Sequence, residues 1–202
     1  MRALLLTLTV LTLAACDVTA PSTQSASMSV EAGDDTARSV HGQTLAAIRG
    51  GTARYHRVEQ ALADGYVPAS PCVFQTDEDD NEVAAMGYHY VNFGLIEGAM
   101  PGDDRSTVID PSAPEILLYE PQRNGRLRLV GVEFMASAAG SDGIAPMLDG
   151  VVFADHTAEE DRHDIPFPHY DLHVWTWRHN PDGLFASHNP NVSCQYAPPA
   201  DA

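Results

Sequence analysis

The amino-acid sequence predicts an α+β fold, a single domain in which N-terminal helices pack on a mainly antiparallel β-sheet. Apolar residues recur at helical spacing only near the start of this domain, between Val40 and Asp64. Later segments are short, rich in aromatic and β-favouring residues, and separated by acidic or Pro/Gly-rich loops. Helices followed by a run of strands are typical of α+β proteins, so we expect one such domain over residues 37–202.

The first 15 residues have the composition of a secretory leader. Arg2 supplies a positive charge, an apolar run follows up to Leu13, and two alanines precede Cys16. The run is shorter than the roughly 20 apolar residues that cross a bilayer. Leu13-Ala14-Ala15-Cys16 resembles the lipobox of bacterial lipoprotein signal peptides. An ordinary secretory peptide followed by an unrelated cysteine would share this leader.

The resemblance implies that residues 1–15 are removed as a signal peptide and that lipid is attached to Cys16. The protein would then be anchored to the extracytoplasmic side of a bacterial membrane, in the cell envelope. Residues 16–36 are rich in Ser, Thr, Ala and acidic side chains, which predicts a disordered tether. The net charge of −17 and the absence of lysine argue against nucleic acid as a partner.

The helical segment carries its apolar residues on one face, and its ends can be predicted from glycines. Gly50-Gly51 predicts a break into two helices, with Thr52 available to cap the second. Gly65 suits the left-handed position that ends a helix. The apolar positions are Ile48, Tyr55, Val58 and Leu62.

Strands are expected in the second part of the domain. Asn124-Gly125 predicts a hairpin turn between two of them, although the flanking residues also allow a longer turn. The expected strands are Met86 to Asn92, Glu115 to Tyr119, Leu127 to Phe134, Gly150 to Ala154 and Tyr170 to Trp177.

Three cysteines occur in the chain. If Cys16 carries lipid, Cys72 and Cys194 remain. Outside the cytoplasm two remaining cysteines are expected to form a disulfide, which would tie the start of the strand region to its end. A metal-thiolate pair is the alternative, but the CxxC spacing typical of such sites is absent.

Candidate metal ligands lie at alternating positions of the last expected strand. Side chains alternate between the two faces of a strand, so His169, Asp171 and His173 share one face. His89 and Glu133 lie in two other expected strands, and a carboxylate within a very apolar strand needs a partner or a metal.

Together His89, Glu133, His169 and His173 could bind a divalent transition metal, with zinc or copper expected ahead of iron or manganese. Asp171 could be a further ligand or could orient one. Alternatively, the histidines make ordinary hydrogen bonds in the core and Glu133 pairs with an arginine.

Two loops allow both a functional and a structural interpretation. The acidic segment from Asp77 to Glu82 alternates carboxylates as calcium loops do, but Glu82 stands where such a loop needs glycine, so a solvated loop is expected. His188-Asn189-Pro190-Asn191 could place a histidine at the mouth of a site, or could simply form a turn before Cys194.

The domain resembles uncharacterised bacterial secreted proteins that combine a Met-Gly-Tyr-His segment with a terminal Asp-Leu-His-Val-Trp segment followed by Asn-Pro and Cys. The corresponding residues here are Met86 to His89 and Asp171 to Cys194. This resemblance implies a shared fold and no particular activity. The sequence therefore predicts a lipid-anchored binding domain with a histidine-carboxylate metal site. A metal-dependent enzyme and a metal-free envelope interaction protein are the alternatives.

Overall fold

A computed structural model describes residues 41–96, 109–140, 143–158 and 165–198. The expected signal peptide, Cys16 and the tether to residue 36 lie outside these ranges. Within them, none of the helices combines the length and the apolar character that crossing a membrane requires.

The helical part of the fold precedes the strands. Residues 41–52 are helical and run directly into η1 (Ala53–His56), and α2 (Val58–Ala63) follows. The helix therefore continues through Gly50-Gly51, contrary to the predicted break. Thr52 does not cap the next helix, because its hydroxyl donates to the carbonyl of Ile48 one turn earlier. Gly65 has a φ of +95°, as its predicted role at a helix end requires.

Gly51 has a packing role that explains why a glycine lies inside a helix. A β-carbon at this position would lie 1.9 Å from the carbonyl oxygen of Ser112, so the backbone before β4 passes directly against the helix. A β-carbon at Gly50 would meet nothing within 4 Å. Gly51 is therefore a point of close backbone approach, and the glycine pair does not interrupt the helix.

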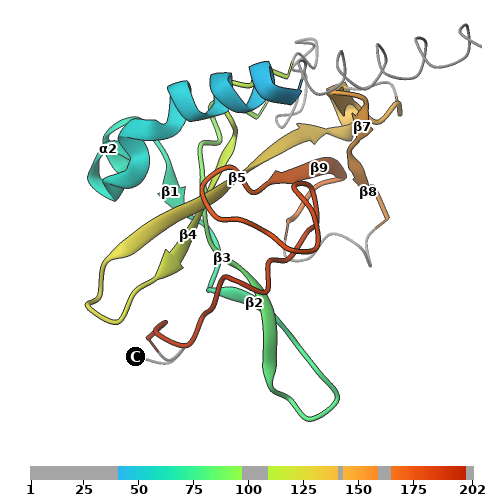
Figure 1. Cartoon of the computed structure of the whole chain (residues 1–202). Coiled ribbons are helices and arrows are strands. Elements are labelled where there is room, and N and C mark those ends of the chain that lie inside the picture. The colour runs from blue at the N-terminus through green and yellow to red at the C-terminus, as the bar shows by residue number, and fades with distance from the viewer. Residues whose placement is uncertain (1–40, 97–108, 141–142, 159–164, 199–202) are drawn as a thin grey trace, which may run out of the picture.

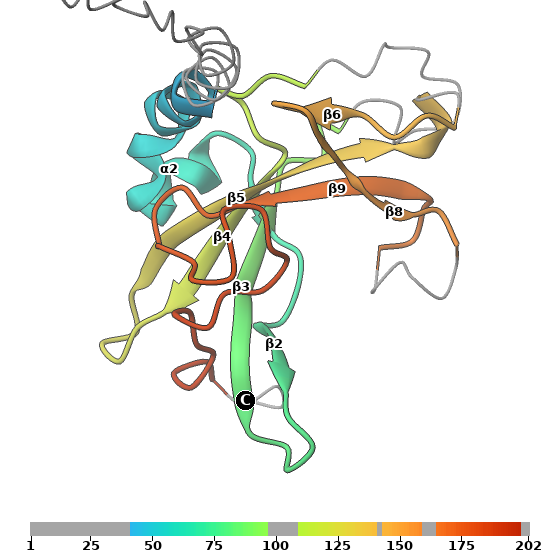
Figure 2. The same cartoon turned by 45° about the vertical axis from the view of Figure 1, so that its right-hand side comes forward.

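Every strand pairing among the described residues is antiparallel. Six strands follow the order β1-β3-β4-β5-β9-β8, β2 joins the same sheet through β3, and β6 pairs with β7 separately. Figures 1 and 2 show the long, twisted sheet with the helical segments above it and the β2–β3 hairpin projecting below. The strands are β1 (Val67–Pro68), β2 (Val73–Thr76), β3 (Glu82–Val91), β4 (Ile116–Pro121), β5 (Leu127–Ser137), β6 (Met147–Leu148), β7 (Val151–Val152), β8 (Ala154–His156) and β9 (His169–Val174), and the short helix η2 (Ala138–Gly140) follows β5.

Most of the predicted strands are present, with two differences. The segment expected as one strand from Gly150 to Ala154 is divided, because β7 pairs with β6 whereas β8 pairs with β9. The last strand ends at Val174, because the amide of Trp175 donates to the carbonyl of Leu184. The β4–β5 hairpin has the longer of the two possible turns: the amide of Gln122 donates to the carbonyl of Arg126, and Gly125 has a φ of +76°.

Both faces of the sheet are buried, which explains why the central strands are apolar on both sides. One buried cluster joins helical residues to one face. Its members include Ile48, Tyr55, Ala61, Leu117, Tyr119, Val132, Phe134, Leu172 and Val174. The hydroxyl of Tyr119 also donates to the carbonyl of Tyr55. A second cluster lies on the other face and includes Ala85, Ile116, Leu118, Met135, Trp175 and Val192.

The predicted disulfide between Cys72 and Cys194 is present, with 5.8 Å between the two Cα atoms. It joins the segment before β2 to the chain after β9, across 122 residues. The amide of Cys194 also donates to Glu82 at the start of β3. These contacts fix the C-terminal segment against the hairpin of β2 and β3.

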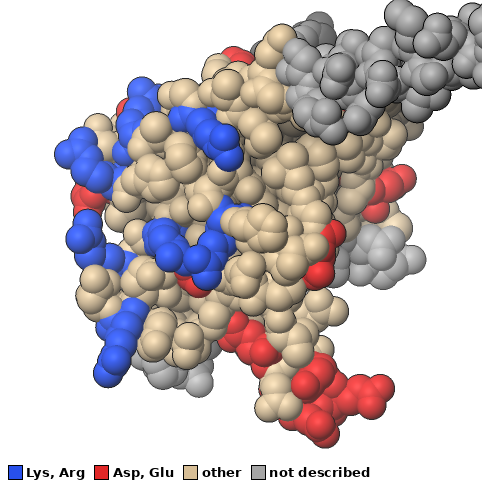
Figure 3. Space-filling model, viewed as in Figure 1, with Lys and Arg blue, Asp and Glu red and all other residues tan. Residues whose placement is uncertain are grey.

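Charge is unevenly distributed over the described surface. Figure 3 shows arginine side chains gathered on one side and carboxylates concentrated at the tip of the β2–β3 hairpin. At that tip the Asp77 carboxylate accepts hydrogen bonds from the amides of Asp79 and Asn81 and from the Asn81 side chain. These donors lower the pKa of Asp77. The acidic loop is thus a solvated turn with its own hydrogen bonds, as expected.

Candidate metal centre

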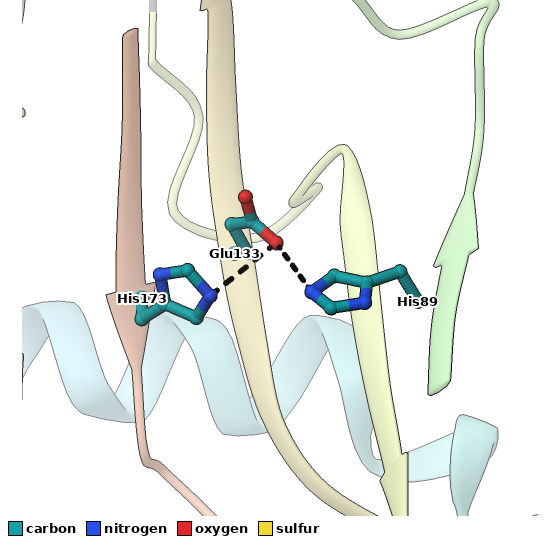
Figure 4. Close-up of side chains that lie close together, drawn as sticks. All are labelled: His89, Glu133 and His173. Carbon is teal, nitrogen blue, oxygen red and sulfur yellow. Dashed lines mark ion pairs between the residues drawn. The ribbon is translucent and has the colours of Figure 1, made fainter. Parts of the chain in front are cut away.

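Three strands bring His89, Glu133 and His173 together on one face of the sheet. Glu133 in β5 lies directly opposite His173 in β9. His89 comes from β3, and β4 passes between β3 and β5. The Glu133 Oε2 atom lies 3.4 Å from His89 Nε2 and 3.6 Å from His173 Nε2. One ligand atom from each residue lies within 4.8 Å of the others, and Figure 4 shows the three side chains converging.

The group is removed from water, and two of its polar atoms lack hydrogen bonds. The side chains of His89, Glu133 and His173 expose 14%, 4% and 6% of their surface. Neither Glu133 Oε2 nor His173 Nε2 has a hydrogen-bond partner among the described residues. Leaving a buried polar atom unpaired costs about 1–3 kcal/mol. A cation between these atoms would satisfy both of them.

Ser70 contacts the ring of His89. The Ser70 hydroxyl lies within hydrogen-bond distance of the Pro71 carbonyl and, at 2.9 Å, of His89 Nδ1; when it donates to the carbonyl, its oxygen accepts from Nδ1. A neutral ring protonated at Nδ1 presents a lone pair at Nε2, the atom that faces Glu133. A hydrogen bond of this kind orients metal-binding histidines in proteins.

His173 is positioned from two directions. Its Nδ1 faces Asp171 Oδ1 at 3.8 Å, which leaves Nε2 directed at Glu133. The indole of Trp175 stacks on its ring with an interplanar angle of 22°. Gly131 makes room for this indole, because a β-carbon there would lie 3.2 Å from Trp175 Cε3. Packing and charge therefore direct His173 Nε2 toward the other two ligand atoms.

Burial disfavours the charged form of each of the three side chains. Burial, together with the charge of His188, lowers the pKa of His89 to about 4. It also lowers the pKa of His173 well below its usual range, aided by the charges of neighbouring histidines. Burial, followed by the charges of Asp171 and Glu115, raises the pKa of Glu133 well above its usual range. The group thus contains neutral donor nitrogens and a carboxyl that a cation would deprotonate.

The two distances from Glu133 to the histidine nitrogens are close to those expected around a small tetrahedral ion. Bonds of about 2.0–2.1 Å at tetrahedral angles place two ligand atoms about 3.3–3.4 Å apart, as around zinc. The observed separations of 3.4 and 3.6 Å are close to that value. Octahedral angles with the same bonds would place neighbouring ligand atoms only about 3.0 Å apart.

His169, the fourth predicted ligand, is not part of this group. Its Nδ1 lies 2.9 Å from the carbonyl of Phe167, and its Nε2 lies 3.8 Å from Asp171 Oδ2. His169 shares the face of His173, as the alternation predicted, but it lies at the start of β9, away from the group. Asp171 lies between the two histidines, which fits the predicted orienting role better than that of a ligand to the same ion.

The segment that carries His188 lies over this face of the sheet, as Figures 1 and 2 show for the loop after β9. The Trp175 indole donates to the carbonyl of Ala186, and Asn189 forms a bridge with Ala85 in β3. His188 is therefore held between β9 and β3. The segment forms the turn that was the alternative interpretation, since the amide of Val192 donates to the carbonyl of Asn189.

Two residues with roles around the centre had no recognisable sequence signal. Ser70 reaches His89 because the amide of Ala69 pairs with the His89 carbonyl, a contact between strands far apart in the sequence. His156 reaches Asp171 because β8 pairs with β9. Only strand pairing could have identified either one.

No protein-family model, curated protein or solved structure matches this chain.

Proposed function

We propose that this protein is a lipid-anchored, extracytoplasmic metal-binding protein whose His89, Glu133 and His173 hold a divalent transition-metal ion. The observation that carries the proposal is the convergence of ligand atoms from three largely buried side chains, two of which have no hydrogen-bond partner among the described residues. An ordinary histidine core would be expected to satisfy these atoms with hydrogen bonds.

Zinc is the ion that the ligand set favours, with copper second. Two imidazoles and a carboxylate suit zinc, and the spacing agrees with tetrahedral geometry. The carboxylates of Asp171 and Glu115 add negative potential near the site. When bound, the ion would take the place of the proton on Glu133 and satisfy His173 Nε2.

A metal-dependent enzyme remains the second candidate, because three protein ligands leave an open coordination position, as catalytic zinc sites do. Burial favours binding over catalysis. Two surface cavities have volumes of about 240 and 560 Å³, and none of the three ligands lines either of them.

Metal titration of the untagged full-length chain tests the proposal. After removal of bound metal, the protein is dialysed separately against zinc, copper(II), iron(II) and manganese(II), and bound metal is measured by mass spectrometry. We expect zinc to bind in stoichiometric amount. His89→Ala, Glu133→Gln and His173→Ala should each weaken zinc binding at this centre by roughly a hundredfold or more, because even residues outside the ligand set contribute about 10–100-fold.

His179→Ala is the matched control, because the His179 side chain is exposed and lies outside this group. It should leave zinc binding unchanged. If none of the four metals binds in stoichiometric amount, or if the three ligand variants bind zinc as the natural protein does, the proposed centre is wrong.

We also propose that the protein is anchored through lipid on Cys16 and that its N-terminal helices pack on one face of the sheet. The lipobox resemblance at Cys16 supports attachment to the membrane through lipid, with the domain held outside the cytoplasm. The buried cluster shared by helices and strands supports packing of the N-terminal helices on the face of the sheet opposite the metal centre. That arrangement leaves the metal centre under the loop that carries His188.

A further inference from the structure

The two surface cavities are neighbours, at the place where the β4–β5 turn meets β3 and the C-terminal segment. The cavity of about 560 Å³ and the cavity of about 240 Å³ share Gln122 and Leu127 in their walls. The larger is lined mainly by tyrosine and proline side chains, and the smaller by polar and positively charged ones. We call the combined surface the hairpin groove; its chemistry comes from Tyr88, Tyr90, Tyr196, Gln122, Arg126 and Arg128.

The tyrosines of the hairpin groove differ from those of the core. In the core, the hydroxyls of Tyr66 and Tyr119 donate to backbone carbonyls. The hydroxyls of Tyr88, Tyr90 and Tyr196 form no hydrogen bond within the described ranges. Each of these three side chains therefore offers a flat apolar ring together with a hydroxyl that can still donate and accept.

The smaller cavity gives the hairpin groove a positively charged end. Arg128 is paired with Glu120, with 2.5 Å between the two side chains. Arg126 is exposed, and its guanidinium forms no ion pair with any residue that the structure describes. The β4–β5 hairpin lies on the side of the molecule where Figure 3 shows the arginine side chains gathered. An anionic group at this end of the groove would meet an uncompensated guanidinium, which suits a carboxylate.

Contacts within the protein fix both walls of the hairpin groove. On one side, the amide of Gln122 donates to the carbonyl of Arg126, and the Gln122 side chain donates to Glu120 Oε2 at 3.0 Å. On the other side, Tyr196 follows the disulfide-bonded Cys194, whose carbonyl accepts from the amide of Ala197. A surface that is already ordered loses little conformational entropy when a ligand binds.

We propose that the hairpin groove binds an acidic oligosaccharide, with sugar rings against the tyrosines and a uronate carboxylate at Arg126. A sugar ring has an apolar C–H face that packs on an aromatic ring, and its hydroxyls pair with those of Tyr88, Tyr90 and Tyr196. A neutral sugar would leave Arg126 without a partner, and a simple anion would leave the tyrosines unused. The groove takes this ligand independently of metal, because none of the three proposed metal ligands lines either cavity.

Isothermal titration calorimetry of the full-length chain tests the proposal. The acidic probes are the tetrasaccharides of galacturonate, of mannuronate and of hyaluronan, and the comparison probes are maltotetraose and inorganic phosphate. We expect at least one acidic tetrasaccharide to bind with a Kd below about 1 mM. Its affinity should fall as salt is added, because the carboxylate contact is exposed and therefore screened. Both comparison probes should bind at least about tenfold more weakly.

Paired variants locate the binding. Tyr196→Ala and Arg126→Gln should each weaken the binding of the acidic tetrasaccharide by about tenfold. Arg126→Gln should also remove the preference over maltotetraose. The matched controls are Phe74→Ala and Arg123→Gln, because both residues are exposed and neither lines the hairpin groove. They should bind as the natural protein does, and circular dichroism confirms that each variant is folded.

Three results would overturn the proposal. The first is that none of the three acidic tetrasaccharides binds. The second is that maltotetraose or phosphate binds as tightly as they do. The third is that Tyr196→Ala and Arg126→Gln bind as the natural protein does. Zinc binding by these two variants should remain that of the natural protein, so failure of the hairpin groove can be distinguished from failure of the metal centre.

Discussion

Glu133 determines much of the chemistry at the residue scale. It is an ionisable side chain in one of the most apolar strands, with only 4% of its side chain exposed. The sequence indicated that such a residue needs a partner. The structure supplies two imidazoles, whose pKa values are lowered by burial, so neither histidine provides a compensating positive charge. Without a cation, the carboxyl must stay protonated or remain a buried, uncompensated charge.

This arrangement predicts a dependence of stability on pH. The folded-state pKa of Glu133 is raised, so between the unfolded and folded pKa values the folded state binds the extra proton. The contribution of Glu133 to stability therefore falls as the pH rises above about 4.5, whereas His89 and His173, whose pKa values are lowered, add stability as the pH rises toward about 6.5. Metal-free Glu133→Gln lacks this loss and should be more stable than the natural protein at pH 8, by about 1–3 kcal/mol.

Urea denaturation at pH 4 to 8 with a chelator present measures the difference. The advantage of Glu133→Gln should grow with pH, whereas Glu59→Gln, at an exposed position on α2, should give a constant difference. Parallel stability curves for the natural protein and Glu133→Gln would contradict the burial of a titrating carboxyl. Excess zinc should reverse the order by stabilising only the natural protein at this centre.

Secondary structure was largely predictable at the element scale, whereas partners across the sheet were not. The alternation around Asp171 placed His169 and His173 on one face, and that placement is confirmed. Sequence spacing could not show that β8 would pair with β9 and bring His156 to Asp171. Ser70 was missed for the same reason, because strand pairing alone brings it to His89.

The two adjacent glycines illustrate where local sequence signals fail. Gly50-Gly51 is an ordinary helix-breaking signal, but Gly51 is required by a contact with Ser112, a residue far along the chain. Gly51→Ala should destabilise the fold by about 1–3 kcal/mol or more, because its β-carbon would overlap the Ser112 carbonyl. Gly50→Ala should stabilise the helix by up to about 1 kcal/mol, because that position is open.

Thermal and urea denaturation of both variants give the comparison directly. The two substitutions make the same chemical change at neighbouring helical positions, so helix propensity affects both alike. The difference between them therefore measures the contact with Ser112. Equal stability of the two variants would show that the backbone before β4 does not pass as closely as described.

At the scale of the whole molecule, the sheet separates two kinds of interior. One face is an apolar cluster shared with the helices, whereas the other combines apolar packing with the histidine-carboxylate groups. The disulfide and the loop after β9 close the second face, since Cys194 lies in its buried cluster and Asn189 forms a bridge with Ala85. A disulfide closing a loop of this length stabilises a fold by about 2–5 kcal/mol. It thereby holds the strands that position the three proposed metal ligands.

Lipid attachment at Cys16 can be tested by labelling the chain with palmitate. Two or three acyl chains hold a protein firmly at a membrane, so palmitate should label the natural chain when it is produced in a bacterium, and the protein should sediment with membranes. Cys16→Ser should lose the label and remain in the soluble fraction, with its zinc stoichiometry unchanged because Cys72 and Cys194 still pair. Cys194→Ser is the control, since it removes a cysteine but leaves the lipobox intact, and it should stay labelled. Labelling that survives Cys16→Ser would reject this site of attachment, and an unlabelled natural chain would favour an ordinary secretory leader.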